Sequence, residues 1–257
     1  MSVLLAPLRW LYCIYSYTLF VIIMLLVFPF ALVATLFGRV RGGNIVMWLC
    51  RVWADVWLGL SAIRFRFIFE TPHDKKRPYI FVSNHISYLD AAIIPKAYRQ
   101  PIRPLGKSEM ARLPIFGLIY RYAIVAVNRS SPEHRAESVR ILKSLIRKGI
   151  SVLVFPEGTF NTTSAPLKSF YDGAFRVAIE TQTPLKPVLV LDSYARMHYR
   201  SVFSLNPGRC RIVYLGEIPV EGLTAEDIPA LREKVFALMS ERLRAYKADW
   251  IATEPAV

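Results

Sequence analysis

The feature that most constrains this chain is a long uncharged stretch near its N-terminus. No charged residue lies between Arg9 and Arg39, and Leu11–Phe37 is apolar almost throughout. A helix of this length can cross the hydrocarbon core of a bilayer. A cleaved secretory signal would have a shorter apolar region followed by a small-residue cleavage site. Pro29 lies in the middle of the stretch and leaves two forms open, a kinked spanning helix or a re-entrant helix.

A second apolar segment, Asn44–Ile63, contains charges and is expected to lie differently. Arg51 and Asp55 suit a helix in the membrane interface better than one that crosses the bilayer. Three tryptophans in the segment support the same position: Trp48, Trp53 and Trp57. We therefore expect residues 1–68 to form a helical membrane anchor, with an interfacial helix at 44–63, and residues 69–257 to form a second domain.

The charge of the chain favours a membrane surface as its partner. The sequence has 33 Lys and Arg residues against 19 Asp and Glu, a formal net charge of +14, and 54% of its residues are hydrophobic. A basic surface attracts anionic lipid headgroups, and it also attracts nucleic acid. The apolar segment and the lack of a nucleic-acid-binding motif favour lipid. We expect membrane lipids, and no nucleic acid, among the partners.

The arginines on the two sides of the apolar stretch predict an orientation. Arg9 precedes it, whereas Arg39, Arg41 and Arg51 follow it. This excess places the downstream domain on the cytoplasmic face, which is the inner-membrane face in a bacterium. The cysteines fit neither a disulfide framework nor a metal-ligand spacing, and this fits a reducing compartment. They are Cys13, Cys50 and Cys210.

From about residue 64 the pattern becomes that of an α/β domain. Ile63–Glu70 alternates with the period of a half-buried strand. Further strands are expected at Tyr79–Ser83, Ile102–Lys107, Ile124–Asn128, Ser151–Phe155, Leu185–Leu191 and Arg209–Leu215. Helices are expected from Ser87 to about Tyr98, between residues 107 and 124, from Ser131 to Gly149, at Gly173–Thr181 and at Thr224–Tyr246. The alternation predicts a largely parallel or mixed central sheet flanked by helices.

The segment Ser83–Asp90 contains an imidazole and a carboxylate that suit acid–base chemistry. A histidine oriented by a carboxylate is the minimum requirement for a general base near neutral pH. On one regular helix five residues rotate by about 500°, which would leave His85 and Asp90 roughly 140° apart. They can meet only if His85 lies in the turn before a helix and Asp90 in its first turns. Ser87 is a candidate N-cap for such a helix. An ordinary polar strand-to-helix turn would use the same residue types.

Four of the expected strands end in polar groups. The His85 turn follows the first strand, Lys107 ends the second, Asn128-Arg129 end the third, and Glu157-Gly158-Thr159 follow the fourth. Ligands of such sheets bind beyond the carboxyl ends of the strands. Main-chain amides at Gly158 and Thr159, beside two cations, would suit an anionic group or a developing oxyanion. Each cation alone also fits a solvated charge at a strand end, and Glu157 fits a structural ion pair with one of them.

These residues fall into four blocks, in an order that resembles the membrane-bound glycerolipid acyltransferases, typified by 1-acylglycerol-3-phosphate acyltransferase. The first block is Asn84-His85 through Asp90, with the spacing His-x4-Asp. The second runs from Leu113-Pro114 to Val127-Asn128-Arg129, the third is Phe155–Thr159, and the fourth is the Leu185–Leu189 strand. The likeness spans roughly residues 75–192. His-x4-Asp alone is common, but with Phe-Pro-Glu-Gly-Thr about 70 residues later it is specific.

The resemblance implies a reaction and a set of roles. His85 would take the proton from the sn-2 hydroxyl of lysophosphatidic acid, which attacks the thioester of an acyl-CoA or acyl-carrier protein and gives phosphatidic acid for phospholipid synthesis. Asp90 would hold the imidazole tautomer and stabilise the imidazolium. Acyl-CoA or acyl-carrier protein would be a co-substrate, and no metal or other cofactor is expected. The implied substrate-binding residues are Asn84, Ser87, Lys107, Arg129, Glu157, Gly158 and Thr159.

Two departures from the family pattern leave the acceptor open. Many members carry Arg or Ser after Glu-Gly-Thr, whereas this chain has Phe160, which cannot neutralise a phosphate. Relatives often have Phe-Lys-x-Gly where this chain has Phe170-Tyr171-Asp172-Gly173. Either Lys107, Arg129 and Lys168 suffice for a phosphate, or the acceptor is another lyso-lipid, such as a lyso amino-acid lipid.

Two alternatives belong to other classes of protein. A catalytically inactive membrane lipid-binding protein would keep the fold without the reaction, but the intact His85 and Asp90 argue against it. A soluble esterase is disfavoured because the sequence has no Gly-x-Ser-x-Gly elbow.

Overall fold

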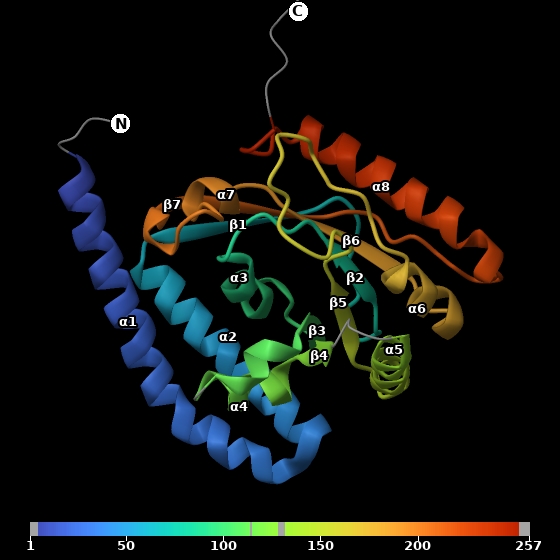
Figure 1. Ribbon diagram of the computed structural model, residues 1–257, viewed down its shortest axis with the longest axis horizontal. Helices are drawn as coiled ribbons and strands as arrows, with labels where there is room; N and C mark the ends of the chain where they lie inside the picture. Colours follow the sequence, from blue (N-terminus) through green and yellow to red (C-terminus); the bar gives the residue numbers. More distant parts are fainter. Residues whose placement is uncertain (1–4, 114, 128–131, 252–257) are drawn as a thin grey trace, which may run out of the picture.

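A mixed sheet forms the centre of this computed structural model, which describes residues 5–113, 115–127 and 132–251 (Figure 1). Within those residues seven strands lie in the order β1-β7-β6-β2-β5-β3-β4. The pairs among β6, β2, β5, β3 and β4 are parallel, β7 is antiparallel to β6, and β1 is parallel to β7. The prediction of a largely parallel or mixed sheet is confirmed. The strands are β1 (Ile63–Phe69), β2 (Ile80–Ser83), β3 (Ile102–Lys107), β4 (Val125–Val127), β5 (Ser151–Val154), β6 (Leu185–Val190) and β7 (Gly208–Tyr214).

The parallel pairing brings the predicted polar strand ends to one edge. Strands β2, β3, β4 and β5 all point their carboxyl ends the same way. Strand β5 lies between β2 and β3, so the turn after β2 is the direct neighbour of the turn after β5. The end of β3 lies one strand further along the edge, and the end of β4 lies two strands further.

Helices cover both faces of the sheet (Figure 1). The first four helices share one hydrophobic core with one face, and α5, α6 and α8 share a second core with the other. Strands β2 and β6 are buried along their whole length, which explains their largely apolar sequences. The helices after the anchor are α3 (Asp90–Ala97), α4 (Phe116–Ala123), α5 (Pro132–Arg147), α6 (Gly173–Thr181), α7 (Ser193–Arg196) and α8 (Ile228–Ala245).

The N-terminal segment folds into two helices that lie side by side. Helix α1 (Leu5–Ala34) runs along one side of the molecule, and α2 (Gly43–Leu60) returns beside it (Figure 1). The chain reverses direction in residues 35–42, through a 3₁₀ turn followed by a π turn. Helix α1 continues through Pro29. The reversal therefore comes after the proline and not at it.

Helix α1 presents an apolar surface to its surroundings. Leu26 and Phe30 are each 66% exposed, and many other large apolar side chains of the helix are exposed as well. In the described residues one helical stretch, Pro7–Leu60, is long and apolar enough to cross a membrane, and only 11% of its most apolar window is buried. An apolar surface of this size, left uncovered by the protein, is typical of a membrane-associated segment.

The charges of α2 face the α/β domain. Asp55 accepts hydrogen bonds from Lys96 Nζ at 2.8 Å and Arg99 Nη2 at 3.0 Å. The Arg51 guanidinium donates to the main-chain oxygens of Pro95 and Tyr98. The two charges from which we predicted an interfacial helix therefore bind α2 to α3 and to the residues that follow α3.

The sheet begins before the predicted boundary at residues 68–69. Strand β1 pairs with β7 from Ile63 to Phe69, so it belongs to the sheet while most of its residues lie in the segment expected to be the anchor. The helical part of that segment ends with α2 at Leu60.

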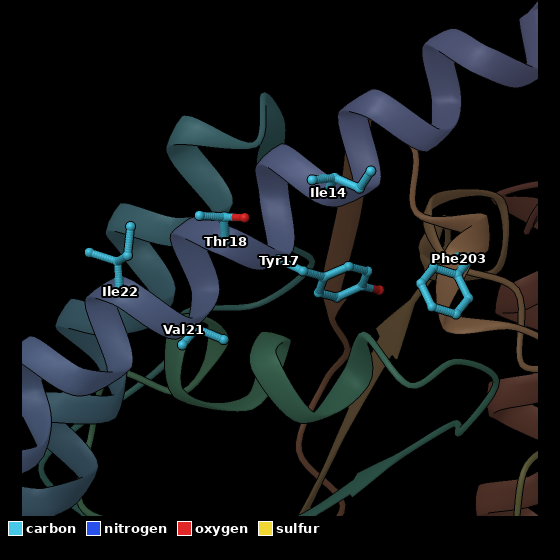
Figure 2. A pocket seen from close by; sticks show the side chains of 6 residues that line it. All are labelled: Ile14, Tyr17, Thr18, Val21, Ile22 and Phe203. Atoms are coloured by element: carbon cyan, nitrogen blue, oxygen red, sulfur yellow. The ribbon is translucent and has the colours of Figure 1, made fainter.

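A loop between α7 and β7 joins α1 to the centre of the protein. Tyr17 of α1 points toward Phe203 of this loop across a shallow apolar hollow of about 470 Å³ (Figure 2). The ring centroids are 6.3 Å apart and nearly perpendicular, and the Tyr17 hydroxyl donates to the oxygen of Val202. At the start of this loop, directly after α7, the main-chain oxygen of Met197 accepts a hydrogen bond from the Ser87 hydroxyl. The loop therefore contacts both α1 and the His85 turn.

Candidate active site

The predicted imidazole–carboxylate pair is present at the carboxyl end of β2. His85 lies in the turn after the strand, and Asp90 is the first residue of α3. Asp90 Oδ2 lies 2.9 Å from His85 Nδ1 and accepts hydrogen bonds from the amides of Ile86 at 2.9 Å and Ser87 at 3.0 Å. The strand–turn–helix arrangement that the five-residue spacing required is therefore confirmed.

The contacts of Asp90 determine which ring nitrogen is available. Two main-chain amides donate to the buried Oδ2, which suits an ionised carboxylate, because that group can only accept hydrogen bonds. His85 Nδ1 then carries a proton, and Nε2 keeps its lone pair. No partner of Nε2 lies among the described residues, and the His85 side chain is 23% exposed whereas that of Asp90 is 1% exposed. The pair can therefore accept a proton at Nε2 from a molecule in the solvent or the membrane.

Two predicted site residues, Asn84 and Ser87, are buried beneath the turn. The side-chain amide of Asn84 donates to the main-chain oxygen of Val190 and accepts from the main-chain nitrogen of Val190, both at 2.9 Å. These two bonds connect the end of β2 to β6. The Ser87 hydroxyl donates to Met197 O and accepts from Leu89 N at 3.0 Å. The N-cap of α3 is Leu89, so the prediction of Ser87 as the cap was wrong, because its hydroxyl is held inside the turn.

Two aromatic rings enclose the imidazole of His85. The ring of Phe155, which follows β5, stacks on it with centroids 4.2 Å apart and planes 17° apart. The ring of Phe160 meets it at 4.4 Å and 60°. Neither residue was predicted to contact His85. Phe155 stands at the end of an apolar strand, but the order of the strands in the sheet was needed to place it beside His85.

Glu157 joins the His85 turn to a distant part of the chain. Its Oε1 accepts from the His85 amide at 2.9 Å, and its Oε2 accepts from the Lys168 amide at 2.8 Å. The residue is 2% exposed, and burial raises the pKa of its carboxyl to about 7, against the opposing effect of the two amides. Among the described residues its hydrogen-bond partners are main-chain amides. These bonds fix the position of the turn.

The turn after Glu157 differs in part from the prediction. Gly158 has φ of +74°, a conformation that favours glycine, and its amide donates to Phe155 O at 3.0 Å. That amide therefore serves the turn and is not directed at a ligand. Thr159 is exposed, and its hydroxyl accepts a hydrogen bond from Lys168 Nζ at 2.9 Å.

The two predicted cations have different positions. Lys107 is exposed at the end of β3, separated from the His85 turn by β5. Arg129, predicted to follow β4, lies outside the described residues. The structure brings together His85, Asp90 and the Glu157–Thr159 turn, and it adds Lys168 to them.

Comparison with known proteins identifies the class to which this fold and site belong. Residues 64–191 match the family model described as Acyltransferase, and this range contains the His85–Asp90 pair and the Glu157 turn. Through this domain the chain belongs to the acyltransferase family.

Two human proteins are among the relatives with similar sequences. The chain is 30% identical over 175 residues to the human 1-acyl-sn-glycerol-3-phosphate acyltransferase alpha, covering 67% of this chain and 61% of the relative. It is 32% identical over 157 residues to the human beta protein, covering 60% of this chain and 56% of the relative. The chain thus spans about three fifths of the length of these relatives.

A solved structure shares the whole fold. The crystal structure of the 1-acyl-sn-glycerophosphate (LPA) acyltransferase PlsC from Thermotoga maritima superposes with a TM-score of 0.73 at 20% identity. The match covers 94% of this chain and 97% of that one, so it includes the N-terminal helices as well as the sheet. At this identity the likeness establishes the fold.

Proposed function

We propose that this protein is a membrane-bound acyltransferase that moves a fatty acyl group from a thioester to the sn-2 hydroxyl of lysophosphatidic acid, giving phosphatidic acid. The observation that carries the proposal is the 2.9 Å contact between His85 Nδ1 and Asp90 Oδ2 inside an acyltransferase family domain, with no partner for Nε2 among the described residues. The names of the curated relatives support lysophosphatidic acid as the acceptor.

The mechanism requires one base and no covalent enzyme intermediate. His85 Nε2 takes the hydroxyl proton as the acceptor oxygen attacks the thioester carbonyl carbon. Collapse of the tetrahedral intermediate breaks the carbon–sulfur bond, and the imidazolium returns the proton to the leaving thiolate. Asp90 stabilises the imidazolium and keeps Nδ1 protonated. Ser87 is unsuited to act as a nucleophile because its hydroxyl is buried and binds Met197 O.

The remaining site residues divide into three groups. Asn84, Ser87 and Glu157 are buried and bound to main-chain atoms, so we assign them to positioning the His85 turn and not to substrate contact. Lys107, Arg129 and Thr159 remain candidates for binding the acceptor or the donor. Gly158 contributes through its turn conformation.

The site would act at the membrane surface, on the cytoplasmic side. Helix α1 supplies an exposed apolar surface, and α2 fixes it to the α/β domain. The excess of arginines after the apolar stretch supports the cytoplasmic side for that domain. Acyl-CoA and acyl-carrier protein are both cytoplasmic thioesters, so this orientation would suit either donor.

The test is an acylation assay with purified protein in mixed micelles. Wild-type protein should acylate lysophosphatidic acid from acyl-CoA or acyl-carrier protein, and His85→Ala should lower kcat by about 10²- to 10⁴-fold. A screen that includes a lyso amino-acid lipid distinguishes the alternative acceptor. Equal turnover by the two proteins would refute the general-base role. No turnover with any lyso-lipid and either donor would favour an inactive lipid-binding protein.

A further inference from the structure

The two ends of the loop from Glu157 to Lys168 lie next to each other. The Lys168 amide donates to Glu157 Oε2 at 2.8 Å, while the other oxygen of the same carboxylate holds the His85 amide at 2.9 Å. One buried carboxylate thus fixes the main chain of Lys168 beside the main chain of His85. Asn161 adds a third connection, because its main-chain amide donates to the main-chain oxygen of His85 at 2.8 Å.

The Lys168 side chain turns toward the same end of the sheet. Its Nζ donates to the Thr159 hydroxyl at 2.9 Å. Thr159 precedes Phe160, whose ring centroid lies 4.4 Å from that of the His85 imidazole. The ammonium group is therefore held by a neutral hydroxyl of the turn that leads from Glu157 to Phe160.

The charge of Lys168 lacks a paired carboxylate among the described residues. Other cations of the domain form ion pairs, such as Arg211 with Asp192 and Arg232 with Asp172, each at 2.6 Å. No ion pair within 4.0 Å is found for Lys168 in the described part of the chain. Glu157 is the acid that shares its loop, but both oxygens of Glu157 accept main-chain amides. The ammonium group of this half-buried lysine is accessible at its exposed contact with Thr159, and such a cation suits an anionic ligand.

Phe160, the residue after Thr159, supplies no positive charge for a phosphate, so another residue must supply it. Phe160 packs its ring against His85 and Tyr88, so the position after Glu-Gly-Thr provides an apolar wall and no charge. A lyso-lipid with its reacting hydroxyl at His85 would carry its phosphate only a few bonds away. The cation that receives this phosphate must then lie close to the His85 turn.

We propose that Lys168 binds the anionic headgroup of the acceptor lipid, with the Thr159 hydroxyl as a second hydrogen-bond partner. The inference rests on the proposed function, since it names the headgroup subsite of the same active site. Lys168 binds the phosphate, Phe160 lines the path between phosphate and hydroxyl, and His85 Nε2 receives the proton.

Steady-state kinetics with two acceptors test the assignment. Lysophosphatidic acid carries the phosphate, and 1-monoacylglycerol has the same glycerol and acyl chain without it. Lys168→Gln should raise KM for lysophosphatidic acid about tenfold or more, equivalent to about 1.4 kcal/mol, and leave kcat within about twofold. Its kinetics with monoacylglycerol should match those of the wild type. Lys168→Arg should restore most of the loss.

Two control variants separate headgroup binding from loop structure. Lys75→Gln removes the same charge from an exposed loop before β2, at the opposite edge of the sheet, and should change neither KM. Thr159→Val removes the hydroxyl that holds the ammonium group and should raise KM for lysophosphatidic acid by about threefold. If Thr159→Val and Lys168→Gln impair both acceptors equally, Lys168 only stabilises the loop and the proposal is wrong.

A binding measurement keeps the two proposals distinguishable. His85→Ala protein can be titrated with short-chain lysophosphatidic acid in a calorimeter, and the added Lys168→Gln substitution should weaken this binding about tenfold. Equal affinities would overturn the role of Lys168, whether or not the wild type is an active enzyme. Absence of binding by the His85→Ala protein would overturn it as well. Lack of turnover alone would overturn only the proposed reaction.

Discussion

The imidazole of His85 stacks on the ring of Phe155, with ring centroids 4.2 Å apart and planes 17° apart. Phe155 follows β5, which is the direct neighbour of β2 in the sheet. The stack fixes the plane of the imidazole, and the hydrogen bond from Nδ1 to Asp90 fixes its rotation within that plane. Together they leave Nε2 one direction in which to accept a proton.

Replacing Phe155 should affect turnover more than binding. Phe155→Leu removes a ring–ring contact of about 0.5–1.5 kcal/mol, so we expect kcat to fall about threefold to tenfold with little change in KM. Phe175→Leu is the control, because Phe175 is fully buried in α6, in the core on the other face of the sheet. It should lower the melting temperature and leave kcat unchanged. Equal kcat losses in the two variants would indicate a general effect of destabilisation.

Replacing the carboxylate should be more severe. Asp90→Asn keeps the size of the side chain but loses the charge that stabilises the imidazolium, so kcat should fall by about 10²- to 10⁴-fold. The turn should also lose about 1–3 kcal/mol of stability, because Asp90 Oδ2 accepts two main-chain amides as well as His85. Asp74→Asn, in the exposed loop before β2, should change neither quantity. Wild-type kcat in Asp90→Asn would contradict the assigned role of Asp90.

Glu157 should make stability depend on pH. Burial raises its pKa from 4.5 to about 7, so the folded state binds a proton that the unfolded state releases. The free energy of unfolding should therefore fall as pH rises from about 4.5 to 7, by at most about 3 kcal/mol from this group. Glu157→Gln should be less stable than the wild type throughout but show a shallower fall, measured by denaturant titration at each pH.

Asp249 provides an internal comparison for that measurement. Desolvation of its carboxyl also raises its pKa to about 7, but the residue is exposed, so solvent screening should make its contribution in the same pH window smaller. Asp249→Asn should remove the part of the fall in unfolding free energy that Asp249 contributes. The double variant with Glu157→Gln and Asp249→Asn should show the smallest dependence of this free energy on pH. An unchanged slope in Glu157→Gln would mean that Glu157 ionises in the folded protein as it does in the unfolded chain.

Two glycines of α2 should respond differently to alanine. A Cβ at Gly43 would lie 2.3 Å from Arg103 Nη2 and 2.7 Å from Tyr122 O, whereas a Cβ at Gly59 would meet nothing within 4 Å. Gly43→Ala should destabilise the protein by about 1–3 kcal/mol, because the buried Arg103 guanidinium must move. Gly59→Ala should stabilise it by up to about 1 kcal/mol. Thermal melts of both variants in the same detergent would test this difference.

The strands that carry the site were predictable because each is a short apolar run between turns. Ile102–Lys107 was predicted with the bounds of β3, and the strands after which His85 and Glu157 stand were predicted to within one residue. Their order was not predictable, since it depends on which helix crosses which face of the sheet. The contact between His85 and Phe155 depends on that order, and so the sequence did not reveal it.

The direction of the polar side chains was harder to predict than their position. Asn84 and Ser87 lie beside His85 in sequence and were expected to face the substrate. Their partners Val190 and Met197 lie 106 and 110 residues away, and these contacts turn both side chains inward. The five-residue spacing of His85 and Asp90 was sufficient for that pair because both partners are local.

The exposed apolar side of α1 also sets the space in which this protein searches for its acceptor. A protein held at a bilayer explores an area and not a volume. Its supply of acceptor is then the mole fraction of that lipid in the membrane, whatever the amount of buffer around the vesicles. Dilution of vesicles of constant composition should leave the turnover of bound protein unchanged, whereas dilution of the acceptor with inert lipid should lower it.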